Sequence, residues 1–424
     1  MAVTNESNWT AAPVSESERI GLIDVLRGFA LLGILSVNMA FFSHPLLATA
    51  SGLPRGSGTL DALADFVVAW LATGKFYPLF SFLFGLGVSI QLERAAARSL
   101  DFKRYFVRRM LILLGFGLAH ALLVWNGDIL VVYALVGLLL FLFRNARPRT
   151  LLIWAAILFA IPLALGLGNA IVSIAVILAM GPALASLDIA ASLDVINRLA
   201  IETYARGSWG QIFIWRAVEW LVMLLSSLLN AGPHIFGLFM LGLYAGKTRL
   251  LSDAPAHSML LRKGLIWGLL IGLPANLLLA LARSSANGNP LSPLLLLAQP
   301  LLLLFGPLLT AGYIGVFAML ARGTARLRLL QPLAAAGRMA LSNYLMQSII
   351  CTTVFYSYGL GLFGKFGAFA GLALTFGIWI LQLIVSLLWL RAFRFGPMEW
   401  LWRTLTYGAR QPMRRDSRPP APGP

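Results

Sequence analysis

The stretch "LIDVLRGFALLGILSVN", residues 22–38, is apolar along most of its length but carries an acid, a base and an amide. A helix of about 20 apolar residues spans a hydrocarbon core of roughly 30 Å, so this stretch predicts a first membrane span. Around such a helix Asp24, Arg27 and Asn38 fall within about 60° of one another. A polar stripe of this kind faces protein or water rather than lipid, and ionisable side chains at membrane depth are candidates for function.

Two further interpretations of the charged pair stay open. Asp24 and Arg27 also fit a salt bridge that fixes helix packing, or a position at the level of the inner headgroups, because Asp24 stands near the start of the span. Asn38 lies about 21 Å along the helix axis from Asp24. It is therefore the polar group of this stretch that is hardest to explain without a function.

The rest of the chain extends the apolar pattern. Its 424 residues are 59% hydrophobic and 12% charged, which is about half the charged fraction of a typical soluble domain. We expect an all-α fold, a polytopic helical membrane protein with about ten transmembrane helices and one or two broken or re-entrant segments. The predicted spans cover residues 20–43, 76–93, 107–126, 128–144, 150–182, 229–246, 264–283, 292–320, 338–360 and 367–392.

The formal net charge is +17. In a membrane protein this excess indicates basic cytoplasmic loops rather than affinity for nucleic acid. If the N-terminus is inside, the inner loops hold the clusters of Lys and Arg at residues 94–109, 144–149, 247–263 and 322–328. Both termini are then cytoplasmic, which requires an even number of spans.

We expect a single transmembrane helical domain over residues 19–408. It follows a disordered cytoplasmic N-terminus, 1–18, and precedes a disordered basic cytoplasmic tail, 409–424. Residues 183–228 are polar enough to lie partly outside the bilayer or at its interface. The fifth span is too long to be straight and predicts a break near residues 165–169. The sixth predicts a break at Gly232–Pro233, with an outer half that lies along or re-enters the membrane.

His120 and Asp128 are the first candidates for catalysis. His120 falls in the outer half of the third span, and the turn Asn126–Gly127 brings Asp128 to the start of the fourth. An imidazole oriented by a carboxylate can act as a general base near neutral pH. The alternative, a packing histidine beside an aspartate that only caps a helix, is equally consistent with the sequence.

Other polar groups lie in or near the spans. His234 follows the proline of the predicted break, and Arg216 and Glu219 form an i,i+3 pair on the preceding segment. Asn343 and Gln347 share one helix face, where amides also serve to join helices. Arg338 stands at the inner start of the predicted ninth span. Arg394 and Arg403, at a predicted amphipathic cytoplasmic helix, suit a phosphate-bearing ligand. No two of the four histidines have HExxH spacing, so no metal site is expected.

Five segments together resemble the YeiB-like family of bacterial membrane proteins. They are "IDVLRGFALLGILSVNM", "KFYPLFSFLFGLG", "AHALLVWNGDILVVYAL", "GRMALSNYLMQSII" and "FGPMEWLWRTLTY", and they run in order from Arg19 to Tyr407. That family is similar to a wider group of transmembrane acyltransferases that includes heparan-alpha-glucosaminide N-acetyltransferase. The part shared with this wider group is mainly the D-x-x-R-G opening, here Asp24, Arg27 and Gly28.

The resemblance implies a multi-pass protein of the bacterial inner membrane that moves an acyl group from cytosolic acetyl-CoA or a longer acyl-CoA to an extracytoplasmic hydroxyl or amine. His120, Asp128 and Asn38 would then be catalytic. The donor would be held by Asp24, Arg27, Arg338, Asn343, Gln347 and Arg403, and the acceptor by His234, Arg216 and Glu219. Membrane lipids are the other expected partners, and a homodimer stays open. The alternatives are a transporter or exporter of a small polar or lipid-linked molecule and a non-catalytic scaffold.

Overall fold

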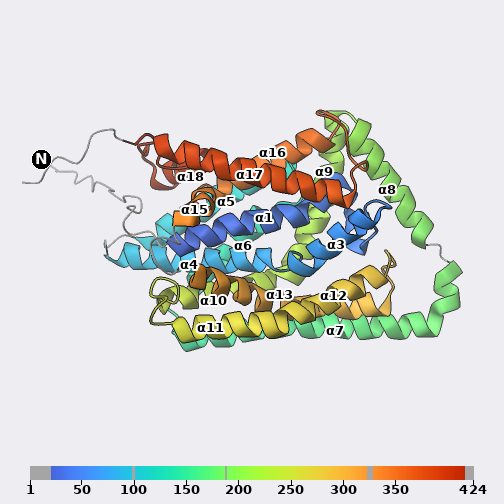
Figure 1. The fold of residues 1–424 in the computed structure, drawn as a ribbon, viewed down its shortest axis with the longest axis horizontal. Helices are drawn as coiled ribbons and strands as arrows, with labels where there is room; N and C mark the ends of the chain where they lie inside the picture. The colour runs from blue at the N-terminus through green and yellow to red at the C-terminus, as the bar shows by residue number, and fades with distance from the viewer. Residues whose placement is uncertain (1–20, 98–100, 187–188, 322–327, 416–424) are drawn as a thin grey trace, which may run out of the picture.

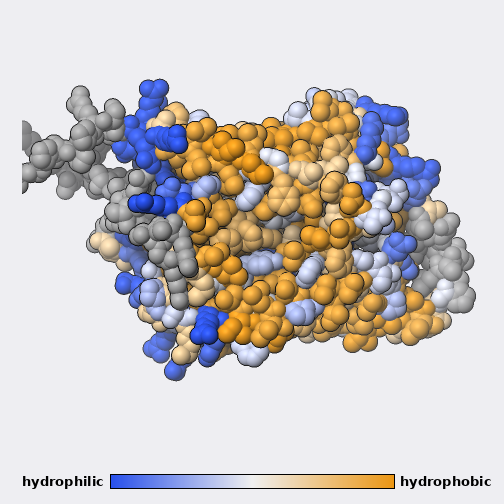
Figure 2. Space-filling view, in the orientation of Figure 1, coloured by the Kyte–Doolittle hydropathy of each residue, from blue (hydrophilic) through white to orange (hydrophobic). Residues whose placement is uncertain are grey.

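The computed structural model describes residues 21–97, 101–186, 189–321 and 328–415, and its named elements are all helices. The helices run mainly along the longest axis of the molecule (Figure 1). On the face shown in Figure 2, a broad apolar band covers the middle, and hydrophilic side chains gather at the two ends. We call the end where α1 (Gly21–Ser43) begins the basic end and the end where it finishes the far end.

Eight helical segments of the described chain are long and apolar enough to cross a membrane. The predicted all-α, polytopic fold is therefore confirmed. The segments are α1, Thr59–Ala97 (α3, Thr59–Leu71, and α4, Phe76–Ala97), α5 (Phe102–Leu123), Pro148–Gly181 within α7 (Pro148–Ser186), Trp209–Lys247 (α9, Trp209–Ser226, and α10, Gly232–Lys247), Ser258–Ser285 (α11, Ser258–Trp267, and α12, Leu273–Ser285), α13 (Pro293–Leu320) and α17 (Ala368–Ala392).

The two remaining predicted spans form shorter helices. Residues 128–144 give α6 (Leu130–Leu140) with a 3-10 turn, Phe141–Phe143, and residues 338–360 give α16 (Ala340–Phe355), which follows α15 (Gln331–Arg338). Three more helices lie outside the spans: α2 (Leu46–Ser51), α8 (Ile189–Arg206) and α18 (Pro397–Tyr407). Figure 1 places α8 at the far end and α18 at the basic end.

Two of the predicted breaks differ from the structure. The helix does not break at 165–169; α7 runs through this region, and within it only Met180 leaves helical geometry. At Gly232–Pro233 the helix does not break, because a π-turn, Ser227–Ala231, joins α9 to α10. A second π-turn, Gly268–Gly272, precedes Pro274 in the same way. Proline lacks an N–H and its ring crowds the preceding turn, and the wider π-turn accommodates both effects.

One span is interrupted, between α3 and α4, and a buried lysine closes the gap. Lys75 has no exposed surface, and its Nζ donates to the carbonyl oxygens of Ala69, at 3.0 Å, and Thr73, at 2.6 Å. Thr310 Oγ1 on α13 donates to the carbonyl oxygen of Lys75 at 2.7 Å. An ammonium group at the carboxyl end of a helix also interacts favourably with the helix dipole. Irregular backbone is stable at this depth because protein surrounds it.

Small residues let neighbouring backbones approach closely. A Cβ on Gly242 would lie 2.0 Å from the carbonyl oxygen of Phe82, and one on Gly85 would lie 2.1 Å from that of Phe239, so α4 and α10 touch through glycines. The same holds for α1 and α15, where a Cβ on Gly28 would lie 2.0 Å from the carbonyl oxygen of Leu333. Close contact of this kind holds helices together where lipid gives no hydrophobic driving force.

The predicted disordered ends fall largely outside the described residues. Residues 1–18 lie outside them entirely, as do residues 416–424 of the predicted tail. The start of that tail is ordered: the backbone N–H of Arg394 donates to Met413 at 2.9 Å, and that of Arg415 donates to Ala392 at 3.1 Å. The chain therefore folds back on the end of α17 before it leaves the described region.

Gly242→Ala tests the contact between α4 and α10. The added methyl group would meet backbone rather than a movable side chain, and overpacking of this kind costs about 1–3 kcal/mol. We expect a lower unfolding temperature for the purified protein in detergent. Gly377→Ala is the matched control, because Gly377 is exposed and a Cβ there would meet nothing within 4 Å. Equal unfolding temperatures for the two variants would contradict the packing described.

Candidate functional site

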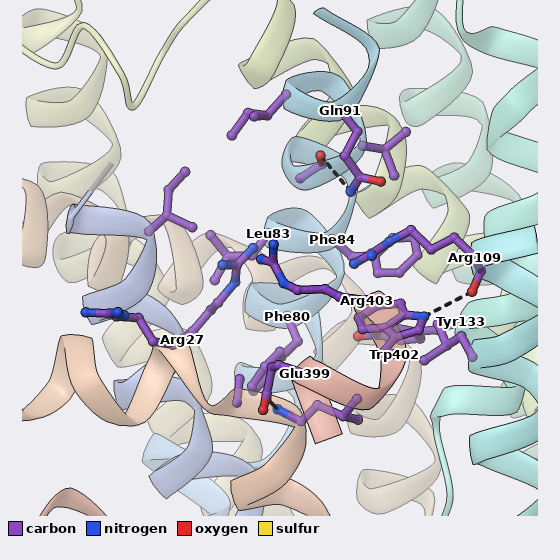
Figure 3. Close-up of a pocket in the computed structure, with 18 of the residues that line it drawn as sticks. Arg27, Phe80, Leu83, Phe84, Gln91, Arg109, Tyr133, Glu399, Trp402 and Arg403 are labelled. Carbon is purple, nitrogen blue, oxygen red and sulfur yellow. Dashed lines mark hydrogen bonds between the residues drawn. The ribbon is translucent and has the colours of Figure 1, made fainter. Parts of the chain in front are cut away.

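A cavity of about 420 Å³ lies at the basic end and runs inward between the helices (Figure 3). Its polar lining contains many more bases than acids. The charged residues that line it are Asp24, Arg27, Arg94, Arg109, Arg338, Arg394, Glu399 and Arg403. Six guanidinium groups and two carboxylates give the cavity a strongly positive potential, which favours an anionic ligand.

The arginines come from helices far apart in the sequence. Arg27 on α1 lies 3.3 Å from Asp24, so this predicted pair is formed. Arg109 on α5 lies over the Trp402 ring, 3.6 Å from its centroid, and Arg403 on α18 lies 4.6 Å from the Phe395 centroid. Neither of these two forms a salt bridge with any described residue. Figure 3 shows Arg27, Arg109 and Arg403 around the same cavity.

Burial lowers the pKa of Arg403, and the positive charge of Arg109 lowers it further. Arginine stays charged at neutral pH even so. Two cations held near each other without a paired carboxylate favour a ligand with more than one negative charge, such as a phosphate or diphosphate.

Glu399 holds the mouth of the cavity together. Its carboxylate accepts hydrogen bonds from the backbone N–H groups of Leu341, at 2.7 Å, and Ser342, at 3.0 Å, at the start of α16. An acid at a helix N-terminus satisfies free N–H groups and complements the helix dipole. The carboxylate of Glu399 thus fixes α18 to α16, and its charge also acts on the nearby guanidinium of Arg403.

The inner end of the cavity is lined by Tyr344, Ile129, Leu130 and Tyr133. Tyr344 is buried, and its hydroxyl, although it lies by the Ile129 backbone, receives no hydrogen bond of good geometry. Directly behind it stands His120, with the ring centroids of the two residues 5.2 Å apart. The cavity thus leads from the arginines to an aromatic residue that contacts the predicted catalytic histidine.

His120 and Asp128 form the predicted dyad. His120 Nδ1 lies 2.7 Å from Asp128 Oδ2, and the two side chains are 1% and 0% exposed. The other carboxylate oxygen, Oδ1, accepts from the backbone N–H of Val131 at 2.8 Å and so caps α6. His120 Nε2 is buried and has no partner. If the proton is on Nδ1, the lone pair of Nε2 is free to accept a proton.

Asn38 does not join this site. It is partly exposed and is not among the residues that line the cavity. Asn343 and Gln347 also lie outside the cavity and join α16 to α17. Asn343 Nδ2 donates to Ser386 at 3.0 Å, and Gln347 Nε2 donates to Gln382 at 2.8 Å. Their contacts are those of amides that hold helices together.

The three predicted acceptor residues are separated from the cavity. His234 is fully buried, between the Tyr77 hydroxyl, 3.0 Å from Nδ1, and the Leu303 carbonyl oxygen, 2.9 Å from Nε2, so it links α4, α10 and α13. The predicted pairing of Arg216 with Glu219 is wrong. Glu219 is instead bound by three uncharged donors, Asn126, Tyr204 and Trp215.

Several residues of the site were not predicted from sequence. Arg109 belongs to the basic cluster at residues 94–109. The sequence of this cluster does not indicate which of its arginines points into the cavity. Tyr344 follows the predicted Asn343 in the sequence. The orientation of α16 about its own axis determines that Tyr344, and not Asn343, lines the cavity. Tyr105 and Tyr407, 302 residues apart, stack at 5.3 Å between centroids at the cavity mouth.

Comparison with known proteins adds the family. Residues 245–409 match the family model described as "Protein of unknown function (DUF418)". The chain is 38% identical over 435 residues to the uncharacterized protein YxaH of Bacillus subtilis (strain 168), which covers 96% of this chain and 98% of that protein. It is 31% identical over 399 residues to the uncharacterized protein YeiB of Escherichia coli (strain K12), with coverage of 93% and 98%. No solved structure matches. The resemblance to YeiB is thus confirmed over nearly the whole length, and this multi-pass membrane protein belongs to the DUF418 family.

Proposed function

We propose that this protein is an acyl-CoA-dependent acyltransferase of the bacterial inner membrane. It takes an acyl group from a donor bound at the basic end and passes it to a hydroxyl or amine presented from the far end. One observation carries the proposal: a single cavity connects a group of arginines with Tyr344, behind which the His120–Asp128 dyad is buried.

The donor suits the two halves of the cavity. The phosphates of coenzyme A would bind among Arg27, Arg109 and Arg403, where charge-assisted hydrogen bonds are strongest. Its adenine ring would stack near the Tyr105–Tyr407 pair, which lines the same mouth. The pantetheine arm and the thioester would extend inward along the apolar wall toward Tyr344. Asp24 holds Arg27, and Arg338 and Arg394 add to the positive potential.

The reaction follows from the free nitrogen of His120. Nε2 takes the proton from the acceptor hydroxyl or amine as its oxygen or nitrogen attacks the thioester carbonyl carbon. Asp128 keeps the ring in the required tautomer and stabilises the imidazolium that forms. The Tyr344 hydroxyl donates a hydrogen bond to the carbonyl oxygen as negative charge develops on it. The C–S bond then breaks, and the leaving thiolate receives the proton from Nε2.

The proposed direction of transfer requires the basic end to face the cytoplasm, in line with the bias of Lys and Arg toward that side. A labelling experiment tests this. Ser192 on α8 and Ser252 after α10 are both exposed, at opposite ends of the molecule, and the native Cys351 is buried. In intact cells we expect Ser192→Cys to react with a membrane-impermeant maleimide and Ser252→Cys to react only after permeabilisation. The reverse pattern would overturn the orientation.

Arg403→Gln tests the donor site. Loss of one cation from the phosphate contacts is expected to weaken binding of acetyl-CoA by about 10- to 100-fold, measured by calorimetry or equilibrium dialysis on purified protein. Arg391→Gln is the matched control, because Arg391 is exposed and does not line the cavity. Failure of the wild type to bind any acyl-CoA, from acetyl to long-chain, would refute the proposed donor.

His120→Ala separates chemistry from binding. We expect the variant to bind acyl-CoA with unchanged affinity and to transfer or hydrolyse the acyl group about 10²- to 10⁴-fold more slowly, the range for loss of a general base. Release of free thiol, followed with a chromogenic disulfide reagent, measures the rate. Binding without any turnover in the wild type would favour the alternative, transport of an anionic or lipid-linked molecule.

A further inference from the structure

Two residues of α1 measure the depth of the arginine-lined cavity. Arg27 and Ile34 both line it, and Arg27 lies nearer the basic end, where α1 begins. The guanidinium of Arg27 is held at the level of Asp24, since Nη1 lies 3.3 Å from Asp24 Oδ1. From residue 24 to residue 34 the helix advances about 15 Å along its axis. A phosphate held by Arg27 therefore lies about 15 Å from the level of Ile34.

The inner wall of the cavity is held firmly in place. Tyr133 belongs to this wall and is 5% exposed. Its hydroxyl lies 2.7 Å from Ser81 Oγ and donates to the carbonyl oxygen of Tyr77 at 3.2 Å. Its ring meets that of Phe84 edge-on, with the centroids 5.5 Å apart. Because the interior is packed on these several sides, Tyr133 cannot move aside for a longer ligand without breaking the contacts.

The arm of an acyl-CoA takes up nearly all of this depth. About thirteen bonds separate the phosphorus of phosphopantetheine from its sulfur, and an extended chain advances about 3.6 Å for every three bonds, so the arm reaches about 16 Å. With the phosphate at Arg27, the thioester lies at the level of Ile34. A palmitoyl chain would extend about 18 Å further, which exceeds the depth between Arg27 and Ile34.

We propose that the donor carries a short acyl group, such as acetyl or propionyl, and that Ile34 sets this limit. The inference rests on the proposed acyl transfer. Ile34 is half-buried, lines the cavity and packs against two buried apolar clusters. Its side chain fills the space that the end of a longer chain needs, and packed side chains resist the insertion of extra methylene groups.

Binding of unreactive donors of graded length tests the limit. S-alkyl-CoA thioethers lack the thioester carbonyl, so their dissociation constants report fit alone, measured by calorimetry on the full-length protein in detergent. For the wild type we expect S-hexyl-CoA to bind at least about tenfold more weakly than S-ethyl-CoA. Ile34→Ala opens the inner wall and should strengthen binding of S-hexyl-CoA about tenfold, with S-ethyl-CoA little changed.

Ile90→Ala is the matched control. Ile90 also lines the cavity and is half-buried, but it lies on α4 one turn before Arg94, toward the basic end. The same deletion there should leave the ratio of the two affinities unchanged. Ile34→Phe covers the case in which the alanine variant does not fold. Its larger ring shortens the cavity, so binding of S-ethyl-CoA should weaken, while 3′,5′-ADP, which has no arm, binds as before.

Two results would overturn the length limit alone. One is a wild type that binds S-hexyl-CoA as tightly as S-ethyl-CoA, which would show that the chain leaves the cavity between helices. The other is the same length dependence in the wild type and in both Ile34 variants. Failure of the wild type to bind any of these compounds, free coenzyme A included, would overturn the proposed donor and the length limit together.

Discussion

Hydrocarbon offers no hydrogen-bond partner, and this constraint decides how every polar side chain inside the bundle is used. Most of them find partners within the protein: Lys75 closes the gap between α3 and α4, His234 joins three helices, and Gln347 reaches across to Gln382. The exceptions stand out for that reason. Among these exceptions are Nε2 of His120 and the Tyr344 hydroxyl, which are buried without a hydrogen-bond partner of good geometry and to which the proposed reaction gives a role.

Close contact between α1 and α15 positions the polar residues at the start of the first helix, residues 22–38. Gly28 meets the backbone of α15, and a Cβ on Gly337 would lie 1.9 Å from the carbonyl oxygen of Asp24. Arg27, one residue before Gly28, is then turned into the cavity while Asp24 holds its side chain. The polar stripe predicted from helical periodicity therefore has two parts with different surroundings. Asp24 and Arg27 line the cavity, and Asn38 does not.

The sequence was sufficient where the evidence was local. Apolar runs located the spans, and the short turn between His120 and Asp128 predicted their contact, which the structure places at 2.7 Å. Contacts between segments far apart in the chain could not be predicted from the sequence. Examples are Arg109 beside Trp402 and Tyr105 beside Tyr407. Helical spacing also misled: Arg216 and Glu219 are three residues apart, but the carboxylate takes partners from α8 and the α5–α6 loop instead.

The paired π-turns carry a consequence for comparing relatives. A π-turn contains one residue more than the α-helical turn it replaces, so it amounts to a single-residue insertion absorbed within a helix. The insertion rotates everything beyond it by about 100° relative to an uninterrupted helix. A homologue whose helix runs without the π-turn would therefore align with a one-residue gap at 227–231 or 268–272. The position of that gap in the alignment determines which residues of the homologue are equivalent to those of α10 and α12.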